Sequence, residues 1–219
     1  MATISYINGR KRYTRPQAIL WSENAGTLSD GFYLPIGQEV GADSSLTTGG
    51  INQFLILSDH NRSDLSFKPQ RIEQRQRMIN GNMRSYHIAD KLGISFSWQN
   101  LPSRAYSKSP DFNANGVTDL LRANDKTSGA YEFTADGGAG GVEILDWYEN
   151  HKGSFWMFLA YDKYSNFGKD DNAYTHTTQY NEAVEVYFAD FSYDVVKRSQ
   201  GNGYGAHDLW NISVSLEEV

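Results

Sequence analysis

Cysteine is absent from all 219 residues of this sequence. Its absence excludes disulfide scaffolds, thiolate metal sites and cysteine nucleophiles, and it fits a chain kept in a reducing cytosol. The sequence also lacks an apolar run of the roughly 18–20 residues that a membrane-spanning helix needs. Its first residues, MATISYINGRKRY, contain no apolar segment of the kind that signal peptides carry. We therefore expect neither cross-links nor a membrane anchor.

Basic residues are fewer than acidic ones. The sequence has 20 Lys and Arg against 26 Asp and Glu, for a net charge of −6. A dedicated nucleic-acid-binding domain is expected to carry the opposite sign. With 39% hydrophobic and 14% aromatic residues the chain has the composition of a folded protein, and its length suits a single domain spanning residues 1–219.

Motifs for catalysis or cofactor binding are missing. There is no G-x-S-x-G nucleophile elbow and no phosphate-binding P-loop. The Gly-rich stretch GGAGG (137–141) lacks the Lys that such a loop needs and is expected to be a flexible joint. None of the five histidines stands at a metal-ligand spacing from another: His60, His87, His151, His176 and His207. We expect no catalytic residue, no cofactor and no metal, and so no enzyme.

One segment, DFNANGVTDLLR, resembles a calcium-binding loop. Asp111, Asn113, Asn115 and Asp119 occupy positions 1, 3, 5 and 9 of the EF-hand pattern. Position 12, which should be a bidentate Glu, is Arg122, and the preceding residues do not read as an entering helix. An Asx-rich turn that leads into a short helix is the expected structure.

Hydrophobic residues recur mainly with a period of two, which is typical of strands. In LWNISVSLEEV they all fall on one face: Trp210, Ile212, Val214 and Leu216. The preceding EAVEVYFADFSYDVV (182–196) is expected to be a neighbouring strand, with Phe188 on one face and Phe191 on the other. Further strands are expected in QAILWSE, GFYLPIG and QFLILSD.

A long polar hairpin is expected around Asn80-Gly81, a pair that favours tight turns. Its first strand, RIEQRQRM, is polar on both faces, so it cannot be buried in the core of its own subunit. It must be solvated or contact a partner. We expect its charged residues to pair with a neighbouring subunit rather than with DNA: Arg71, Glu73, Arg75, Arg77 and Arg84.

The strongest helix candidate is VEILDWYENH (142–151), where apolar residues recur at helical spacing. Gly153 stands where a C-capping glycine is expected. Four charged residues fall on the expected outer face: Glu143, Asp146, Glu149 and Lys152. Paired carboxylates work as acid and base only when their environments separate their pKa values, and exposure to water does not do this.

Three polar segments, 37–53, 101–116 and 162–181, are expected to form long loops. Loops of this length in a compact domain are usually functional or become ordered at an interface. The predicted fold class is mainly β, with two packed antiparallel sheets forming a β-sandwich or partial barrel, one flanking α-helix and long loops.

The sequence resembles the tail tube and related tail proteins of long-tailed bacteriophages. The resemblance lies in the strands HDLWNISVSLEEV and VEVYFADFSYDVV and in the helix VEILDWYENHKG, which runs into SFWMFLAYD. The hairpin RIEQRQRMINGNMRSYHIADK and the following ISFSWQNLPSRAYS are similar to virion tail proteins as well. The resemblance covers only part of the chain, and no motif in it is diagnostic alone.

The resemblance implies a tail-tube fold and a structural role. Such subunits form hexameric rings whose inner sheets join into one barrel, and the rings stack into a conduit for DNA ejection. The implied partners are other copies of the chain, the tape-measure protein, a baseplate or terminator protein and, in a contractile tail, the sheath. DNA passes without specific binding, no membrane is involved, and the protein is located in the virion tail after assembly in the host cytoplasm.

Two other structural roles and one enzymatic role stay open at this point. The chain could be a distal-tail or baseplate adaptor, or a ring that terminates the tube. It could also be a carbohydrate- or receptor-binding β-sandwich whose loop aromatics stack on sugars: Tyr106, Tyr164, Phe167, Tyr174 and Tyr180. A hydrolase that uses loop carboxylates ranks last.

Overall fold

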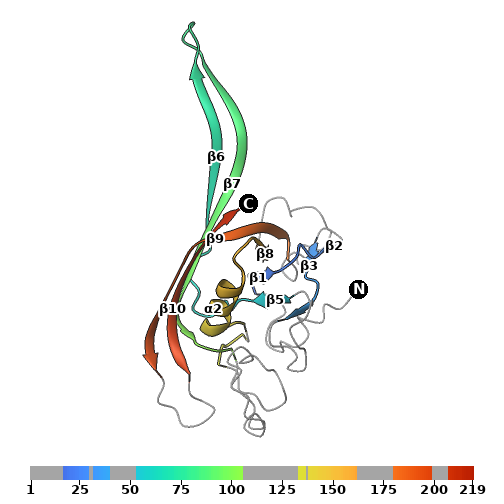
Figure 1. Ribbon diagram of the computed structural model, residues 1–219, viewed down its shortest axis with the longest axis vertical. Coiled ribbons are helices and arrows are strands. Elements are labelled where there is room, and N and C mark those ends of the chain that lie inside the picture. The colour runs from blue at the N-terminus through green and yellow to red at the C-terminus, as the bar shows by residue number, and fades with distance from the viewer. Residues whose placement is uncertain are drawn as a thin grey trace.

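The computed structural model describes residues 17–29, 32–39, 53–105, 133–136, 138–161, 180–198 and 207–219. Within these ranges the chain is mainly β, with one helix flanking the strands, which confirms the predicted class (Figure 1). The elements are β1 (Ile19–Ser22), β2 (Thr27–Ser29), β3 (Phe32–Leu34), β4 (Gln38–Glu39), β5 (Gln53–Ile56), β6 (Ser66–Arg77), β7 (Met83–Pro102), α2 (Gly141–Asn150), β8 (Phe155–Leu159), β9 (Glu182–Arg198) and β10 (Asp208–Glu218).

The main sheet has the strand order β4-β5-β1-β8-β9-β10-β7-β6, and a small second sheet pairs β2 with β3. Among the described strands, only β4 and β5 pair in parallel. β9 pairs with β8 through residues 182–186 and with β10 through residues 186–198. It therefore links two layers, one built from β5, β1 and β8 and the other from β9, β10, β7 and β6.

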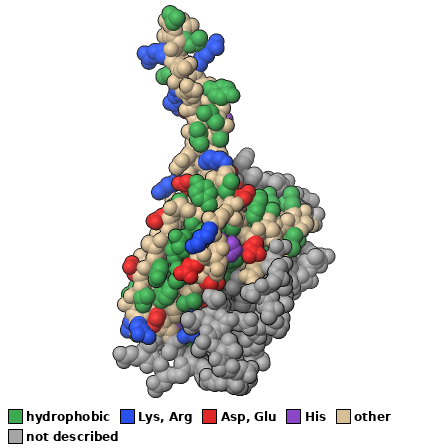
Figure 2. Space-filling model, viewed as in Figure 1, with side chains coloured by type: hydrophobic (Ala, Val, Ile, Leu, Met, Phe, Trp, Pro, Cys, Tyr) green, Lys and Arg blue, Asp and Glu red, His purple; other side chains and the backbone are tan. Residues whose placement is uncertain are grey.

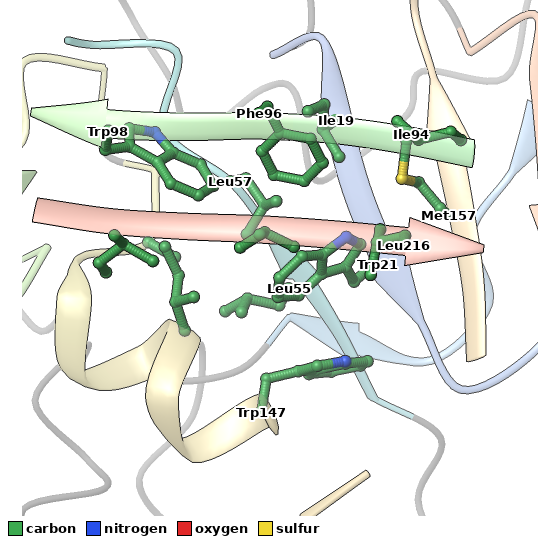
Figure 3. Close-up of a cluster of buried hydrophobic side chains, with 14 of the residues drawn as sticks. Ile19, Trp21, Leu55, Leu57, Ile94, Phe96, Trp98, Trp147, Met157 and Leu216 are labelled. Carbon is green, nitrogen blue, oxygen red and sulfur yellow. The ribbon is translucent and has the colours of Figure 1, made fainter. Parts of the chain in front are cut away.

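The core lies between these layers and against α2 (Figure 3). Trp21 of β1 is fully buried. The centroid of its ring lies 6.4 Å from the ring centroid of Phe96 in β7 and 5.3 Å from that of Phe188 in β9. The alternation expected for β10 is confirmed and has a counterpart on β7. The alternating buried residues of the two strands are Ile94, Phe96, Trp98, Trp210, Ile212, Val214 and Leu216, and Leu101 and Pro102 at the end of β7 are buried as well.

Helix α2 was expected and is present, but its C-terminal cap differs from the prediction. The backbone N–H of His151 donates to the Trp147 carbonyl at 3.0 Å, and His151 Nδ1 lies 2.9 Å from the same oxygen. His151 thus caps the last turn, and its ring stacks on Trp147. Gly153 lacks the positive φ of a C-capping glycine, so that prediction is wrong.

β9 contains a β-bulge at Ala189, where its register against β10 shifts by one residue. The extra residue turns Phe191 onto the face of Phe188, and both rings pack against Tyr148 of α2. The prediction that Phe191 lies on the opposite face is wrong, because strict alternation does not allow for an inserted residue.

The Gly-rich stretch before α2 is a close crossing of chains. A Cβ at Gly138 would lie 2.4 Å from Cα of Ser58, and one at Gly140 would lie 2.6 Å from the carbonyl carbon of Arg104. Only glycine allows the backbones to approach this closely. The expected flexible joint is therefore wrong for these two residues.

Replacing Trp147 should test the packing of α2 on the sheet. We expect Trp147→Ala to lower the free energy of unfolding by about 3–5 kcal/mol, because the side chain is buried and the substitution leaves a cavity. Urea denaturation followed by circular dichroism measures the change. Glu149→Gln, on the exposed side of the same helix, is the control and should change stability by less than about 0.5 kcal/mol. Equal losses in the two variants would contradict the placement of the helix.

Candidate functional site

The strands β6 and β7 extend beyond the body as a two-stranded projection, which we call the arm (residues 69–92; Figure 1). At its tip, Gly81 N–H donates to the Met78 carbonyl at 2.9 Å, and Met78 N–H donates to the Asn82 carbonyl at 2.8 Å. Gly81 has φ +82°. The predicted hairpin is confirmed, with a three-residue loop whose last residue is left-handed.

One face of the arm carries charged contacts, of which the Arg71–Asp90 ion pair joins its two strands. The Asp90 carboxylate lies 3.1 Å from Arg71 Nε and 3.1 Å from His87 Nε2. The hydrogen bond from His87 and, next, that from Arg71 hold the pKa of Asp90 below its ordinary value. These pairs are exposed, so they contribute little to stability, and they balance part of the charge of the arm.

A second exposed cluster lies closer to the tip. Glu73 accepts hydrogen bonds from Ser85 Oγ at 2.5 Å and from Arg75. These two bonds, with the Ser85 bond first, lower the pKa of Glu73. Arg71 and Arg75 therefore already have carboxylate partners in their own hairpin. Among the described residues Arg77 and Arg84 have no ion pair, and their pairing with a neighbouring subunit stays a prediction.

The opposite face and the tip of the arm expose apolar side chains. Tyr86 is 72% exposed and Ile72 is 45% exposed, and both lie on the face without ion pairs. Further apolar side chains are exposed at the bulge in β7 and at the tip: Met78, Ile79, Met83 and Ile88. Figure 2 shows apolar and basic side chains together along the arm. Exposed apolar side chains gathered in one region are typical of interaction sites.

Charge is unevenly distributed between the arm and the rest of the chain. The arm contains five basic and two acidic residues, for a net charge of +3, whereas the whole chain carries −6. The remainder therefore carries −9. Opposite net charges favour contact between the arm of one molecule and the remainder of another.

The outer face of the layer β9–β10–β7–β6 consists of small polar and acidic residues. They alternate with the buried core residues, and the strand registers place them side by side. They are Ser66, Ser95, Ser97, Asp190, Ser192, Asp194, Asn211, Ser213, Ser215 and Glu217. This set, which we call the serine face, includes three acidic residues, and the same registers place Lys68 and Lys197 at its two ends.

The same layer has a free edge at each side. In the described part of the chain β6 pairs only with β7, so its outer edge is unpaired there over residues 66–77. β9 pairs with β8 only as far as Val186, so among the described residues its edge is unpaired over 187–198. The edge of β9 is twelve residues long, whereas nine of the twelve residues on the edge of β6 (69–77) belong to the arm and only residues 66–68 lie in the layer. Unpaired backbone groups on such edges are templates for pairing with another chain.

Glu143 was expected on the exposed face of α2, and that prediction is wrong. Its side chain is only 4% exposed. Its Oε2 accepts a hydrogen bond from Gly140 N–H at 2.8 Å, and its Oε1 accepts one from Ala105 N–H at 3.4 Å. A Glu three residues after a helix N-cap is a recognised sequence signal for this arrangement, because it satisfies a free N–H of the first turn.

Burial raises the pKa of Glu143 to about 7, although backbone hydrogen bonds and the charge of Arg104 act in the opposite direction. A raised pKa is a common property of catalytic acids. Here both carboxylate oxygens are engaged by backbone N–H groups, and the side chain holds the start of α2 against the residues that follow β7. The Glu143 carboxylate thus has a structural role, because it connects the start of α2 to the chain segment after β7.

The other expected site residues give no enzyme-like cluster in the described part of the chain. No group of His, Asp or Glu there could hold a metal ion. Asp111, Asn113, Asn115 and Asp119 lie outside the described residues, as do most residues of the three expected loops. Tyr180 is fully buried against Phe158, so it cannot stack on a sugar from solution.

Comparison with models of known protein families and with curated proteins finds no match for this chain. No helix in the described ranges is long and apolar enough to cross a membrane.

Glu143 should make stability depend on pH. Its folded pKa of about 7 lies above the ordinary value of 4.5, so the folded protein binds the proton more tightly than the unfolded chain. The resulting stabilisation is complete below about pH 4.5 and is lost as the pH rises to about 7. We expect the free energy of unfolding of Glu143→Gln, measured relative to that of the unaltered protein, to rise by up to about 3 kcal/mol from pH 4.5 to pH 8. Urea denaturation across this range measures the difference, and parallel profiles would contradict it.

Proposed function

We propose that this protein is a structural subunit of a bacteriophage tail tube, which assembles into stacked hexameric rings around a conduit for DNA. The observation that carries the proposal is the layer β9–β10–β7–β6. It combines a buried inner face, a polar outer face and two free edges. The resemblance of the sequence to tail proteins supports the same role, which requires neither a catalytic residue nor a cofactor.

Strand direction makes the two edges suitable partners for each other. Neighbouring strands in this layer are antiparallel, so β9 and β6 at its two edges run in opposite directions. A second copy can be related to the first by rotation about an axis parallel to the strands, which keeps the strand directions unchanged. The β6 of the second copy then lies beside the β9 of the first copy, and the two strands are antiparallel. Because the layer has an even number of strands, the alternation then continues from copy to copy.

Pairing of two different edges is a heterologous contact, and it leaves one free edge of each kind on the growing assembly. Such a contact produces either a closed ring or an open filament. Closure pairs the two edges of the layer with each other, which reduces the hazard that unpaired strands present. With four strands from each of six copies, the barrel exceeds the about 16–18 strands that already leave an aqueous channel.

The serine face fits the inside of such a ring. The buried face of the layer packs against β1, β8 and α2, so the serine face is the side left for the bore. Short hydroxyl side chains leave the bore smooth and wet. The three acidic residues on this face, Asp190, Asp194 and Glu217, would repel the phosphates of DNA and prevent it from sticking.

The arm fits the contact between successive rings. It projects along the strand direction beyond the body and carries exposed apolar side chains at its tip. Its charge of +3 is opposite to that of the remainder of the chain, which is the surface that another ring would present. Arg77 and Arg84, which have no ion pair with any described residue, are the residues that we expect to contact carboxylates there.

Electron microscopy of the purified protein tests the proposal. We expect rings with a central hole that stack into tubes as the concentration rises. Isolated rings would instead favour the adaptor or terminator role, and a protein that stays monomeric at all concentrations would contradict both. Binding on a glycan array would then support the carbohydrate-binding alternative.

Shortening the arm should separate ring formation from stacking. Removing residues 74–77 together with 83–86 deletes four opposed pairs and leaves the turn and the body unchanged. We expect this variant to keep its fold and to lose tube formation, as measured by sedimentation and microscopy. Gln76→Ala, which alters an uncharged exposed side chain of the full-length arm, is the control and should form tubes normally. Unchanged tube formation by the shortened protein would contradict a stacking role for the arm.

A further inference from the structure

The junction between the arm and the body is a place where one strand changes partners. β7 is a single strand of twenty residues, whose first half forms the arm and whose second half lies in the body. β10 follows β7 as far as the pair Glu217–Gly93. The next residue of β10, Glu218, pairs with Val186 of β9. From Leu92 back to Met83 at the tip, β7 therefore has no backbone partner on the β10 side among the described residues.

The side chain of Glu218 replaces the missing backbone partner. Its Oε2 accepts a hydrogen bond from the Leu92 N–H at 2.9 Å. A carboxylate that accepts a backbone N–H makes a charge-assisted bond, which is stronger than the ladder bond it stands in for. The first unpaired N–H of the arm is thereby held to the end of β10.

The residues on either side of this bond strengthen the connection. The Lys91 ammonium group donates to the backbone carbonyl of Val219. Val219 N–H in turn donates to the Glu185 carbonyl of β9 at 3.0 Å. The base of the arm is thus linked through the end of β10 to β9, which is the strand that joins the two layers.

We propose that Glu218 and Val219 form a latch that sets the direction of the arm, with Gly93 as the pivot. A two-stranded ribbon has little stability or stiffness of its own, so its direction depends on the contacts at its base. A Cβ at Gly93 would make only ordinary contacts, the nearest with the Lys68 carbonyl oxygen at 3.5 Å. Glycine is therefore not required there for space, and what it supplies is backbone freedom.

Contacts on the β6 side leave this role to the latch. Phe67 packs against Tyr161 with ring centroids 5.1 Å apart, and it lies opposite Ile94, within the body. Beyond that pair β6 is an edge strand without a second neighbour among the described residues. Beyond the last ladder pair, Glu217–Gly93, the contacts described on the β10 side of β7 are those of Glu218 and Val219.

The consequence for assembly rests on the proposed function. An arm that docks on another ring must project in a defined direction, because an arm free to swing would lose entropy on docking. A loosened latch should weaken stacking and leave the fold of the subunit intact. The direction of the arm in the isolated subunit is a separate property, which can be measured whether or not tubes form.

Double electron–electron resonance on the dilute monomer tests the latch. The chain has no native cysteine, so spin labels at Asn82→Cys on the tip and Glu149→Cys on α2 report one distance. We expect Glu218→Ala to broaden the distance distribution at least twofold. Glu217→Ala is the matched control, because Glu217 bonds to Tyr187 and not to the arm, and it should leave the distribution narrow.

Two further measurements test the hydrogen bond between Glu218 and Leu92 directly. Glu218→Gln keeps a carbonyl acceptor and should retain most of the narrow distribution. Hydrogen exchange at the Leu92 amide should speed up at least tenfold in Glu218→Ala, with core amides of β10 unchanged. Equal distributions in Glu218→Ala and Glu217→Ala, or faster exchange throughout β10, would overturn the latch. Failure of the unaltered protein to form tubes would instead overturn the proposed function and leave the latch standing.

Discussion

The packing of one face of the β9–β10–β7–β6 layer against Trp21 and α2 is the constraint on which the other features depend. In a strand, successive side chains point to opposite faces, so burying Ile212, Val214 and Leu216 places the serines between them outside. The serine face is therefore a consequence of the core. The same packing leaves β6 and the second half of β9 at the edges of the layer, where no described strand covers them.

Two long strands each belong to two parts of the molecule, and this sharing connects the core to the proposed assembly. β9 joins the two layers through the pairing of residues 182–186 with β8, and then leaves its edge free. β7 passes from the core into the arm without interruption. The arm ends in exposed apolar and basic groups, whereas the remainder of the chain carries excess negative charge.

Local patterns in the sequence predicted the strands, the hairpin and the helix, because period-two alternation, Asn80-Gly81 and the apolar stripe of α2 act over short distances. Three features could not be predicted in this way. The bulge at Ala189 reverses the facing of Phe191, and alternation contains no sign of it. The burial of Glu143 depends on Ala105, which is distant in sequence, although the capping-box spacing was available as a signal. The free edges follow from the order of strands in the sheet, which composition and periodicity do not specify.

The central claim is that the serine face lines the bore of a closed assembly. The absence of native cysteine allows a direct measurement, with a single cysteine introduced at Ser213 and a second protein carrying one at Glu149. Both sites should react with a maleimide attached to a large polymer when the protein is monomeric. In assembled tubes the account predicts that the cysteine at position 213 is protected from this bulky reagent, whereas the one at position 149 still reacts. Full reaction at position 213 in intact tubes would contradict the account.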